Sequence, residues 1–265
     1  MVKIALDAGH GINTAGKRTP DGEREWTFNS KVLLACSARL NKYQDVQILR
    51  LDDPTGNTDV PLATRTNKAN AWKADALVSI HHNAFDGKWG SHGGVETLVQ
   101  EIIASKASKD IAAIINPLIV KAMGLRDRGV KSKNNHMTRV SNMPAILTEG
   151  GFMDSKTDIP ALRSDAKLKA QGEAIADGLA AYFKLKLKVV GTPAPPKEDE
   201  ELKFSSPTVR KAYEKLLESK ATQEIVINGG IKAGAFNASW RTKWENKELA
   251  PDDIVGLAVL FATKK

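Results

Sequence analysis

Short apolar runs alternate with amphipathic helical segments through residues 1–188 of this 265-residue chain. The strand-type runs lie at residues 2–6, 46–51, 76–80, 94–99 and 145–148. The helix-type segments lie at residues 25–40, 61–71, 111–122 and 168–183. Strands that alternate with helices favour an α/β layer fold, because sheet and helices bury their apolar faces against each other. The sequence therefore predicts a twisted, mostly parallel sheet flanked by helices.

The clearest break in composition lies at residues 189–201. Pro193, Pro195 and Pro196 are followed there by a run of charged residues. Proline stiffness followed by charge, with nothing to bury, is typical of a tether. We therefore expect a large domain over residues 1–188, a linker over 189–201 and a small module over 202–265. The module is predicted to be α+β, with a strand at 224–227 that ends in an Asn-Gly-Gly turn.

Charge and cysteine content narrow the classes of partner and site. Lys and Arg number 39 against 31 Asp and Glu, which gives a formal net charge of +8. A basic protein favours polyanionic partners such as nucleic acid, anionic lipid or an anionic cell wall. Cys36 is the only cysteine, so an internal disulfide and any cysteine-rich zinc or redox motif are excluded.

Neither end of the sequence is typical of a targeting segment. The N-terminal apolar run meets Asp7 before a signal-like core has formed. The apolar run at residues 254–262 is far shorter than the roughly 20 residues that a membrane span needs. We expect a protein that is synthesised in the cytoplasm without a signal peptide and that has no membrane partner.

Two histidines and one glutamate stand where elements begin or end. His10 and His81 each follow a predicted strand, and Glu25 begins a predicted helix. Two imidazoles and one carboxylate form the donor set of a catalytic zinc site, whose fourth position is left to water. The alternative is that both histidines are hydrogen-bonded loop residues.

Glu149 is the second informative acid. It follows an apolar strand and precedes Gly150-Gly151, where the backbone can turn tightly and a substrate can approach. An acid in such a position is a candidate general base for water activated by a metal. The alternative is a capping or salt-bridged glutamate.

Several short motifs occur in a specific order. They are Asp7-Ala8-Gly9-His10-Gly11, Glu25 with Asn29 four residues later, Ser79-Ile80-His81-His82-Asn83-Ala84, Gly94-Val95-Glu96-Thr97 and Pro144-Ala145-Ile146-Leu147-Thr148-Glu149-Gly150-Gly151-Phe152. Together they resemble the zinc-dependent N-acetylmuramoyl-L-alanine amidases of the third amidase type, which are bacterial and phage cell-wall hydrolases. One such motif is weak, but several in the right order are specific. The resemblance covers roughly residues 1–185.

The resemblance implies roles for particular residues. His10, Glu25 and His81 take the positions of the ligands of one catalytic Zn²⁺, and Glu149 takes that of the catalytic glutamate. His82 stands at a variable position, so we expect it not to bind metal. Glu23 is a rival of Glu25 but lacks an Asn four residues later.

The implied reaction is cleavage of the amide between N-acetylmuramic acid and L-alanine in bacterial peptidoglycan. Arg65 and Asn83 are candidates for polar support of the substrate, although structural roles, such as a pairing of Arg65 with a surface acid, are the alternative.

The sequence departs from many members after His10-Gly11, where Ile12-Asn13-Thr14 and a longer loop over 16–22 stand. This variant looks more like phage lysins, which act on the wall after release from the host cytoplasm. A mother-cell lytic enzyme is the alternative.

The C-terminal module is a candidate wall-binding element. Trp240 and Trp244 lie one helical turn apart and are able to stack on sugar faces, while lysines meet anionic wall polymers. The alternative is that both tryptophans are buried in the core of the module. Because a core of this size is marginal alone, self-association through the module is a further expectation.

Two other functions remain open from sequence. One is a zinc amidohydrolase or peptidase that cuts another amide of the cell wall. The other is a polyanion-binding protein without enzyme activity. Against a nucleic-acid partner, no helix shows a dense Lys/Arg stripe, and no basic segment with interleaved aromatics stands out.

Overall fold

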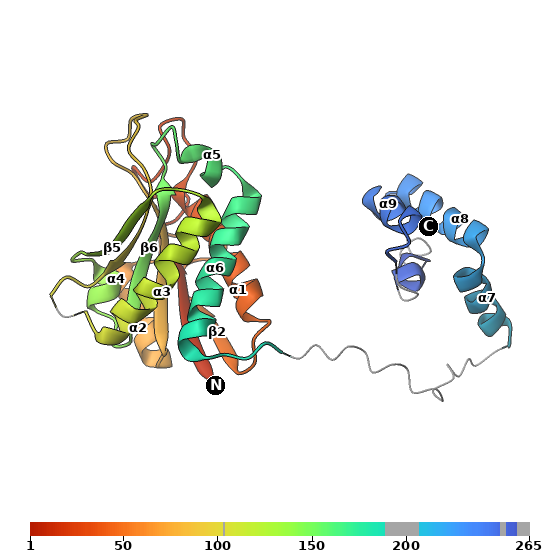
Figure 1. Ribbon diagram of the computed structural model, residues 1–265, viewed down its shortest axis with the longest axis horizontal. Coiled ribbons are helices and arrows are strands. Elements are labelled where there is room, and N and C mark those ends of the chain that lie inside the picture. The colour runs from red at the N-terminus through yellow and green to blue at the C-terminus, as the bar shows by residue number, and fades with distance from the viewer. Residues whose placement is uncertain (103, 189–206, 250–252, 259–265) are drawn as a thin grey trace. The chain divides into compact units, whose positions relative to one another are not determined.

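The computed structural model describes residues 1–102, 104–188, 207–249 and 253–258. The chain divides into two compact units, Met1–Val190 and Gly191–Lys265 (Figure 1). The predicted linker at 189–201 lies outside the described residues. Each unit is therefore considered by itself. Among the described residues, no helix combines the length and apolar character required to cross a membrane.

A six-stranded sheet forms the centre of the N-terminal unit, in the order β2-β1-β3-β6-β4-β5. Its strands are β1 Val2–Ala8, β2 Val46–Arg50, β3 Ala76–Asn83, β4 Val95–Val99, β5 Asp127–Ser132 and β6 Ala145–Phe152. All neighbouring strands are parallel except β4 and β6, which are antiparallel. The prediction of a mostly parallel sheet flanked by helices is confirmed. The central strands read as continuous apolar runs because helices cover both faces of a parallel sheet.

Strand β5 is missing from the sequence prediction. Its residues, Asp-Arg-Gly-Val-Lys-Ser, are mostly exposed, and the strand lies at one edge of the sheet. An edge strand with polar side chains carries no run of buried apolar residues, so periodicity does not reveal it. Strand β3 also continues past its predicted end at Ile80, because pairing with β6 extends to Asn83.

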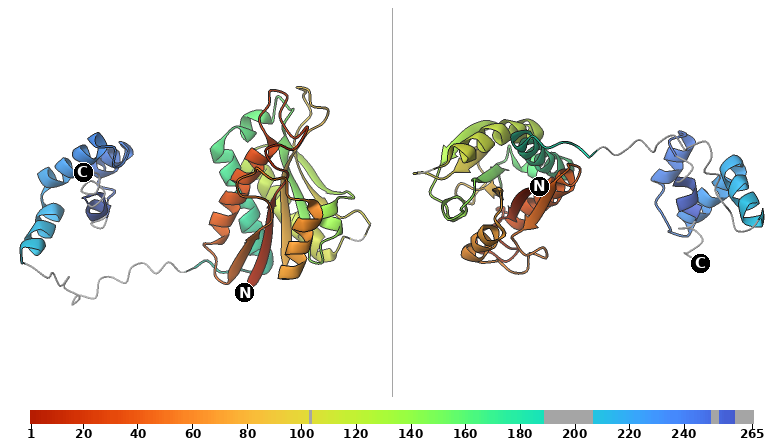
Figure 2. Two further views of the ribbon diagram at one scale, coloured as in Figure 1. Left: turned by 180° about the vertical axis from the view of Figure 1, so that it is seen from behind. Right: turned by 90° about the horizontal axis from the view of Figure 1, so that it is seen from below.

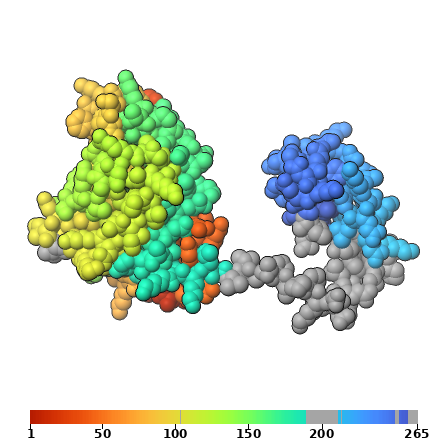
Figure 3. Space-filling model, viewed as in Figure 1, coloured from red at the N-terminus to blue at the C-terminus, as the bar shows by residue number. Residues whose placement is uncertain are grey.

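Helices cover the two faces of the sheet unequally. On one face lie three long helices, α1 Glu25–Leu40, α3 Lys106–Met123 and α6 Asp165–Phe183. They enclose the larger apolar core around Leu6, Ile80 and Ile146. Figure 3 shows α3 and α6 side by side over this face. On the other face, α2 Leu62–Trp72 and the short α4 His136–Arg139 cover a smaller core (Figure 2).

This second face also carries buried polar residues, among them Asp7, Ser79 and Glu96. Strands β1, β3 and β6 are parallel, so their carboxyl ends meet at one edge of the sheet. Functional groups in α/β sheets tend to lie at that edge. His10, His81 and Glu149 belong to these three strands or to the residues directly after them. A short helix, α5 Ile159–Leu162, follows β6.

The described residues of the C-terminal unit form helices joined by short turns. Its elements are α7 Pro207–Glu218, α8 Lys220–Lys232 and α9 Ser239–Glu245, and residues 253–258 are also helical. The predicted strand at 224–227 is wrong, because these residues lie inside α8, and the described residues of the module, which was predicted to be α+β, contain no strand. Gly230 does not form a turn: a Cβ atom there would lie 2.2 Å from the Phe236 ring. This glycine permits close packing within a helix, which local sequence does not distinguish from a turn.

Candidate metal centre and active site

Three side chains from separate elements converge at the carboxyl edge of the sheet. His10 Nε2 lies 3.3 Å from Glu25 Oε2, and His81 Nδ1 lies 2.9 Å from Glu25 Oε1. The two imidazole rings meet edge to face with centroids 4.8 Å apart. One donor atom from each residue lies within 4.8 Å of the others. Side chains far apart in sequence therefore form a compact N, N, O donor set.

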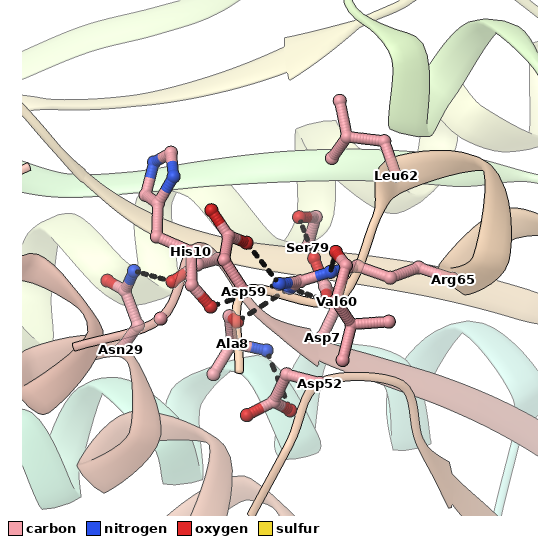
Figure 4. Close-up of polar contacts among 12 residues, drawn as sticks. Asp7, Ala8, His10, Asn29, Asp52, Asp59, Val60, Leu62, Arg65 and Ser79 are labelled. Atoms are coloured by element: carbon pink, nitrogen blue, oxygen red, sulfur yellow. Dashed lines mark hydrogen bonds and ion pairs between the residues drawn. The ribbon is translucent and has the colours of Figure 1, made fainter. Parts of the chain in front are cut away.

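His10 is held by a buried arginine beneath its loop (Figure 4). The backbone of His10 is left-handed, with φ 68°, a conformation that needs support from its surroundings. Arg65, which is 1% exposed, donates to the His10 carbonyl at 3.0 Å and to the Ala8 carbonyl at 2.9 Å. Its guanidinium also pairs with Asp7 at 2.6 Å and with Asp59 at 2.9 Å. Arg65 thus shapes the His10 loop from below.

Glu25 is almost completely buried at the first residue of α1, where the helix dipole favours a carboxylate. Asn29, one turn later, donates to Glu25 Oε1 at 3.3 Å and to the Gly9 carbonyl at 3.1 Å. Burial alone would raise the pKa of Glu25. The hydrogen bond with His81 and the charges of His81 and His10 outweigh burial and lower that pKa to about 2. Glu25 is therefore ionised, as a metal ligand must be.

The orientation of His81 follows from its other neighbours. Ser79 Oγ donates its single hydrogen to the ion-paired Asp7 carboxylate at 2.6 Å. Its remaining lone pairs are therefore available to accept from His81 Nε2 at 3.2 Å, while His81 Nδ1 faces Glu25 Oε1 at 2.9 Å. Because a carboxylate oxygen can only accept, either a proton carried by Nδ1 or a metal cation must lie between these two atoms. Gly9 permits this ring position, because a Cβ atom there would lie 2.0 Å from the ring.

The donor set fits zinc. Burial lowers the pKa of His10 to about 4, so its imidazole is neutral and has a free lone pair. Burial would also lower the pKa of His81, but the hydrogen bond and charge of Glu25, aided by Glu149 and Asp7, raise it. A proton or a metal cation between His81 and Glu25 satisfies the same pair of atoms. Two imidazoles and a carboxylate are the protein ligands of many catalytic zinc sites.

Neither His82, which was expected not to bind metal, nor Glu23, the rival of Glu25, belongs to the donor set. His82 is buried on the opposite face of β3, with Nδ1 2.8 Å from Asn29 Oδ1 and Nε2 3.1 Å from Gln171 Oε1. Glu23 is exposed and pairs with Arg163 at 2.6 Å. Within the described ranges, His10, Glu25 and His81 form the one cluster of His, Cys, Asp or Glu whose donor atoms converge in this way.

Glu149 lies beside the donor set. It is the register partner of His81 across the β3–β6 pairing. Its Oε2 atom is buried and has no hydrogen-bond partner among the described residues. Burial raises the pKa of Glu149 to about 8, and the charges of Glu25 and Glu96 add to that effect while His81 opposes it. A carboxyl group with a raised pKa and an unpartnered oxygen is suited to exchange a proton with water or substrate, and a cation held by the donor set would favour the ionised form that a general base needs.

Asn83 and three residues that sequence reasoning left without a role complete the surroundings. Asn83 Nδ2 donates to Glu96 Oε1 at 3.1 Å, so this amide is held by a neighbouring carboxylate. Asp7 and Ser79 orient His81, and Glu96 lies next to Glu149. Each is a polar residue buried in an otherwise apolar strand. That pattern is the sequence signal that marks them.

Residues 4–181 match the family described as N-acetylmuramoyl-L-alanine amidase. The amidase CwlM of Bacillus licheniformis is 37% identical over 186 residues, which covers 70% of each protein. The endolysin of Bacillus phage SPP1 is 34% identical over 203 residues, 74% of this chain and 71% of the endolysin. Among solved structures, the catalytic domain of the amidase CwlV from Bacillus (Paenibacillus) polymyxa var. colistinus superposes with a TM-score of 0.64 and 28% identity. That superposition covers 70% of this chain and all of the domain.

Proposed function

The chain belongs to the N-acetylmuramoyl-L-alanine amidase family, and from that membership we propose a specific reaction and mechanism for it. The substrate is bacterial peptidoglycan. The bond cleaved is the amide between the lactyl group of N-acetylmuramic acid and L-alanine of the stem peptide. His10, Glu25 and His81 hold one zinc ion, and Glu149 is the general base and acid.

The convergence of the three donor side chains is the observation that carries this proposal. When bound, zinc polarises the scissile carbonyl and lowers the pKa of water towards roughly 7. His10 and Glu25 come from the loop after β1 and the start of α1, and His81 comes from β3. Rigid elements and the buried Arg65–Asp7–Ser79 network hold these ligands in place.

Glu149 carries the proton in the proposed reaction. Its unpartnered Oε2 accepts a proton from the attacking water as that water adds to the scissile carbonyl carbon. The protonated Glu149 then donates to the nitrogen of the leaving L-alanine as the C–N bond breaks. The carboxylate is regenerated, and one water is consumed for each amide cleaved.

Two measurements test the reaction together. Metal analysis of the purified protein is expected to find one zinc per chain. Mass spectrometry of digested peptidoglycan is expected to find new L-alanine amino termini and intact glycan strands. Cuts within the stem peptide would instead support the alternative of a cell-wall peptidase. Zinc-free protein that neither binds metal nor cuts walls would support a non-enzymatic polyanion-binding protein.

We also propose that the enzyme reaches the wall as a lysin does, after release from the cell that makes it. The similarity to a phage endolysin supports this route. Production of the protein inside a susceptible bacterium is expected to cause lysis only when the membrane is permeabilised separately. Lysis without permeabilisation would contradict the proposal.

For the C-terminal unit we propose wall binding. A cavity of about 440 Å³ lies between α7, α8 and α9. It is lined by residues that include Trp244, Gln223 and Lys220, and the Lys220 ammonium lies 5.7 Å from the centre of the Trp244 ring. An aromatic face beside a cation suits a sugar that carries an anionic substituent. Both Trp240 and Trp244 are half-buried. Their exposure therefore lies between the two alternatives from sequence, which were exposed sugar-stacking residues and buried core residues.

Wall binding is testable in the full chain. In a Glu149→Gln background, which preserves the walls, the protein is expected to sediment with purified walls. Trp244→Ala is expected to weaken that sedimentation. Trp240→Ala is the matched control, because Trp240 lies on the same helix but does not line the cavity. Equal sedimentation of both variants and the parent would show that this cavity does not bind walls.

A further inference from the structure

A row of polar side chains runs across the sheet from the donor set, on the face opposite to α1, α3 and α6. His81 is paired in register with Glu149, and Glu149 is paired in register with Glu96. Residues directly opposite each other on neighbouring strands point to the same face. The row therefore runs from β3 over β6 to β4, with Glu149 in the middle and Glu96 one strand farther from His81.

Two cations on β5 extend this row. Arg128 Nε lies 2.6 Å and Lys131 Nζ 2.8 Å from Glu96 Oε2. The register of β4 and β5 shifts between Val95 and Thr97, at the position of Glu96. One carboxylate therefore meets two cations, and this end of the row carries a net positive charge.

The two cations differ in how firmly they are held. The Arg128 guanidinium lies 4.9 Å from the centre of the Phe152 ring, and its Nη1 faces the Gly93 carbonyl at 3.4 Å. Its Nη2 has no hydrogen-bond partner in the described part of the chain and remains a free donor. Lys131 is more open, with 43% of its side chain exposed, so its ammonium is accessible from solvent. A guanidinium held in a fixed orientation, beside a lysine ammonium that can adjust its position, suits the binding of a carboxylate.

We propose that Arg128 and Lys131 bind the free carboxylate of the acidic residue that follows L-alanine in the stem peptide. This inference rests on the proposed function, in which the scissile amide lies beside Glu149. Neighbouring strands lie about 5 Å apart, so the cations at Glu96 lie little more than one strand spacing beyond Glu149. Two extended residues span about 7 Å, which places the carboxylate of the second residue within their reach. Peptides in which this carboxylate is amidated lose the ionic contact.

The test compares two synthetic muramoyl peptides that differ only at the second residue. One carries glutamate with a free α-carboxylate, and the other carries its amide. The full-length zinc-loaded enzyme is expected to cleave the acid form with a kcat/KM about tenfold higher, as one charge-assisted hydrogen bond near a surface supplies. Lys131→Met is expected to reduce this ratio to about twofold or less through KM. Lys169→Met is the matched control, because Lys169 is an exposed lysine that pairs with Glu173 on α6.

The outcomes separate this inference from the proposed function. Cleavage of both peptides at equal rates by the parent enzyme would overturn the carboxylate site and leave the amidase reaction intact. A Lys131→Met enzyme that retains the full preference would also overturn it. Failure to cleave either peptide, together with failure to cleave walls, would instead contradict the proposed function. Loss of the preference in Lys169→Met would show a general charge effect and would likewise overturn the assignment to β5.

Discussion

Glu149 lies directly opposite His81 across the parallel pairing of β6 and β3. The same histidine contacts Glu25 at 2.9 Å through its Nδ1 atom. Two glutamates therefore approach one imidazole, and their surroundings separate their acidities. The pKa of Glu25 is lowered to about 2 by contact with His81 and His10 despite its burial, whereas burial raises the pKa of Glu149 to about 8. Such a pair is suited to divided roles, one as ligand and one as proton carrier.

Replacement of Glu149 tests the proton carrier. Glu149→Ala is expected to retain the fold and one zinc per chain, because Glu149 lies outside the donor set. Its kcat on peptidoglycan is expected to fall by about 10²- to 10⁴-fold, the usual contribution of a general base. Metal analysis and release of L-alanine amino termini provide the measurements. A rate near that of the parent enzyme would contradict the assignment.

Replacement of two nearby glutamates tests the ligand set. Glu25→Gln removes the carboxylate shared by both histidines, so stoichiometric zinc binding is expected to be lost. Glu23→Gln is the matched control, because the Glu23 side chain is exposed and pairs with Arg163 rather than with the donor set. Zinc is also expected to raise the melting temperature of the parent and the control, since a ligand that binds only the folded state stabilises it. Tight zinc binding by Glu25→Gln would place the metal elsewhere.

Ser79 is expected to act as a positioning residue for His81. Ser79→Ala removes the acceptor of the Nε2 hydrogen and the link to Asp7. Loss of such an orienting partner typically weakens metal affinity by about 10- to 100-fold. Competition with a chelator measures that affinity directly. Ser108→Ala, at a buried serine in the first turn of α3, is the control and is expected to bind zinc as the parent does.

Arg65 is expected to stabilise the fold beneath the site. Arg65→Met leaves the Asp7 carboxylate buried without its cation and removes donors from the Ala8 and His10 carbonyls. Breaking a buried ion pair in this way costs about 3–5 kcal/mol in the free energy of unfolding. Urea denaturation measures the loss. Arg163→Met, which removes an exposed arginine paired with Asp21 and Glu23, is expected to cost at most about 1 kcal/mol.

Asp154 is expected to make stability depend on pH in the acid range. Burial by itself would raise the pKa of Asp154, but hydrogen bonds from His92 and from the backbone of Phe85, Asp86 and Gly87 lower it. A carboxyl with a lowered native pKa stabilises the fold above its unfolded value of about 3.9, and that stabilisation is lost as pH falls through the native value.

The corresponding measurement compares Asp154→Asn with the parent protein. Loss of the charge-assisted bonds is expected to destabilise the variant by about 2 kcal/mol at neutral pH. The difference in the free energy of unfolding is expected to shrink as the pH falls below about 4. A difference that does not change down to pH 2 would show that Asp154 does not titrate with folding.

The sequence predicts a helix or strand reliably when the spacing of its own apolar residues shows which of its faces are buried. Helix α1 is predicted with its observed bounds, because Phe28, Val32 and Cys36 repeat on one buried face. The central strands are equally clear, since both of their faces are covered. The error at 224–227 has the same origin, because β-branched residues before two glycines resemble a strand and a turn. In the structure, Ser219 caps α8 and the Phe236 ring packs closely against Gly230 within that helix.

By itself, the sequence determined the alternation of strands and helices and the candidates His10, Glu25, His81 and Glu149, because strand ends and short motifs are local features. Only the tertiary structure decided what surrounds those candidates. The order β3-β6-β4-β5 places Glu149 between His81 and Glu96 and brings Arg128 and Lys131 to the same row. Burial of Asp7, Ser79 and Arg65 in one network orients His81. These contacts join residues distant in the chain, so their energies depend on strand order and register, which no local pattern encodes.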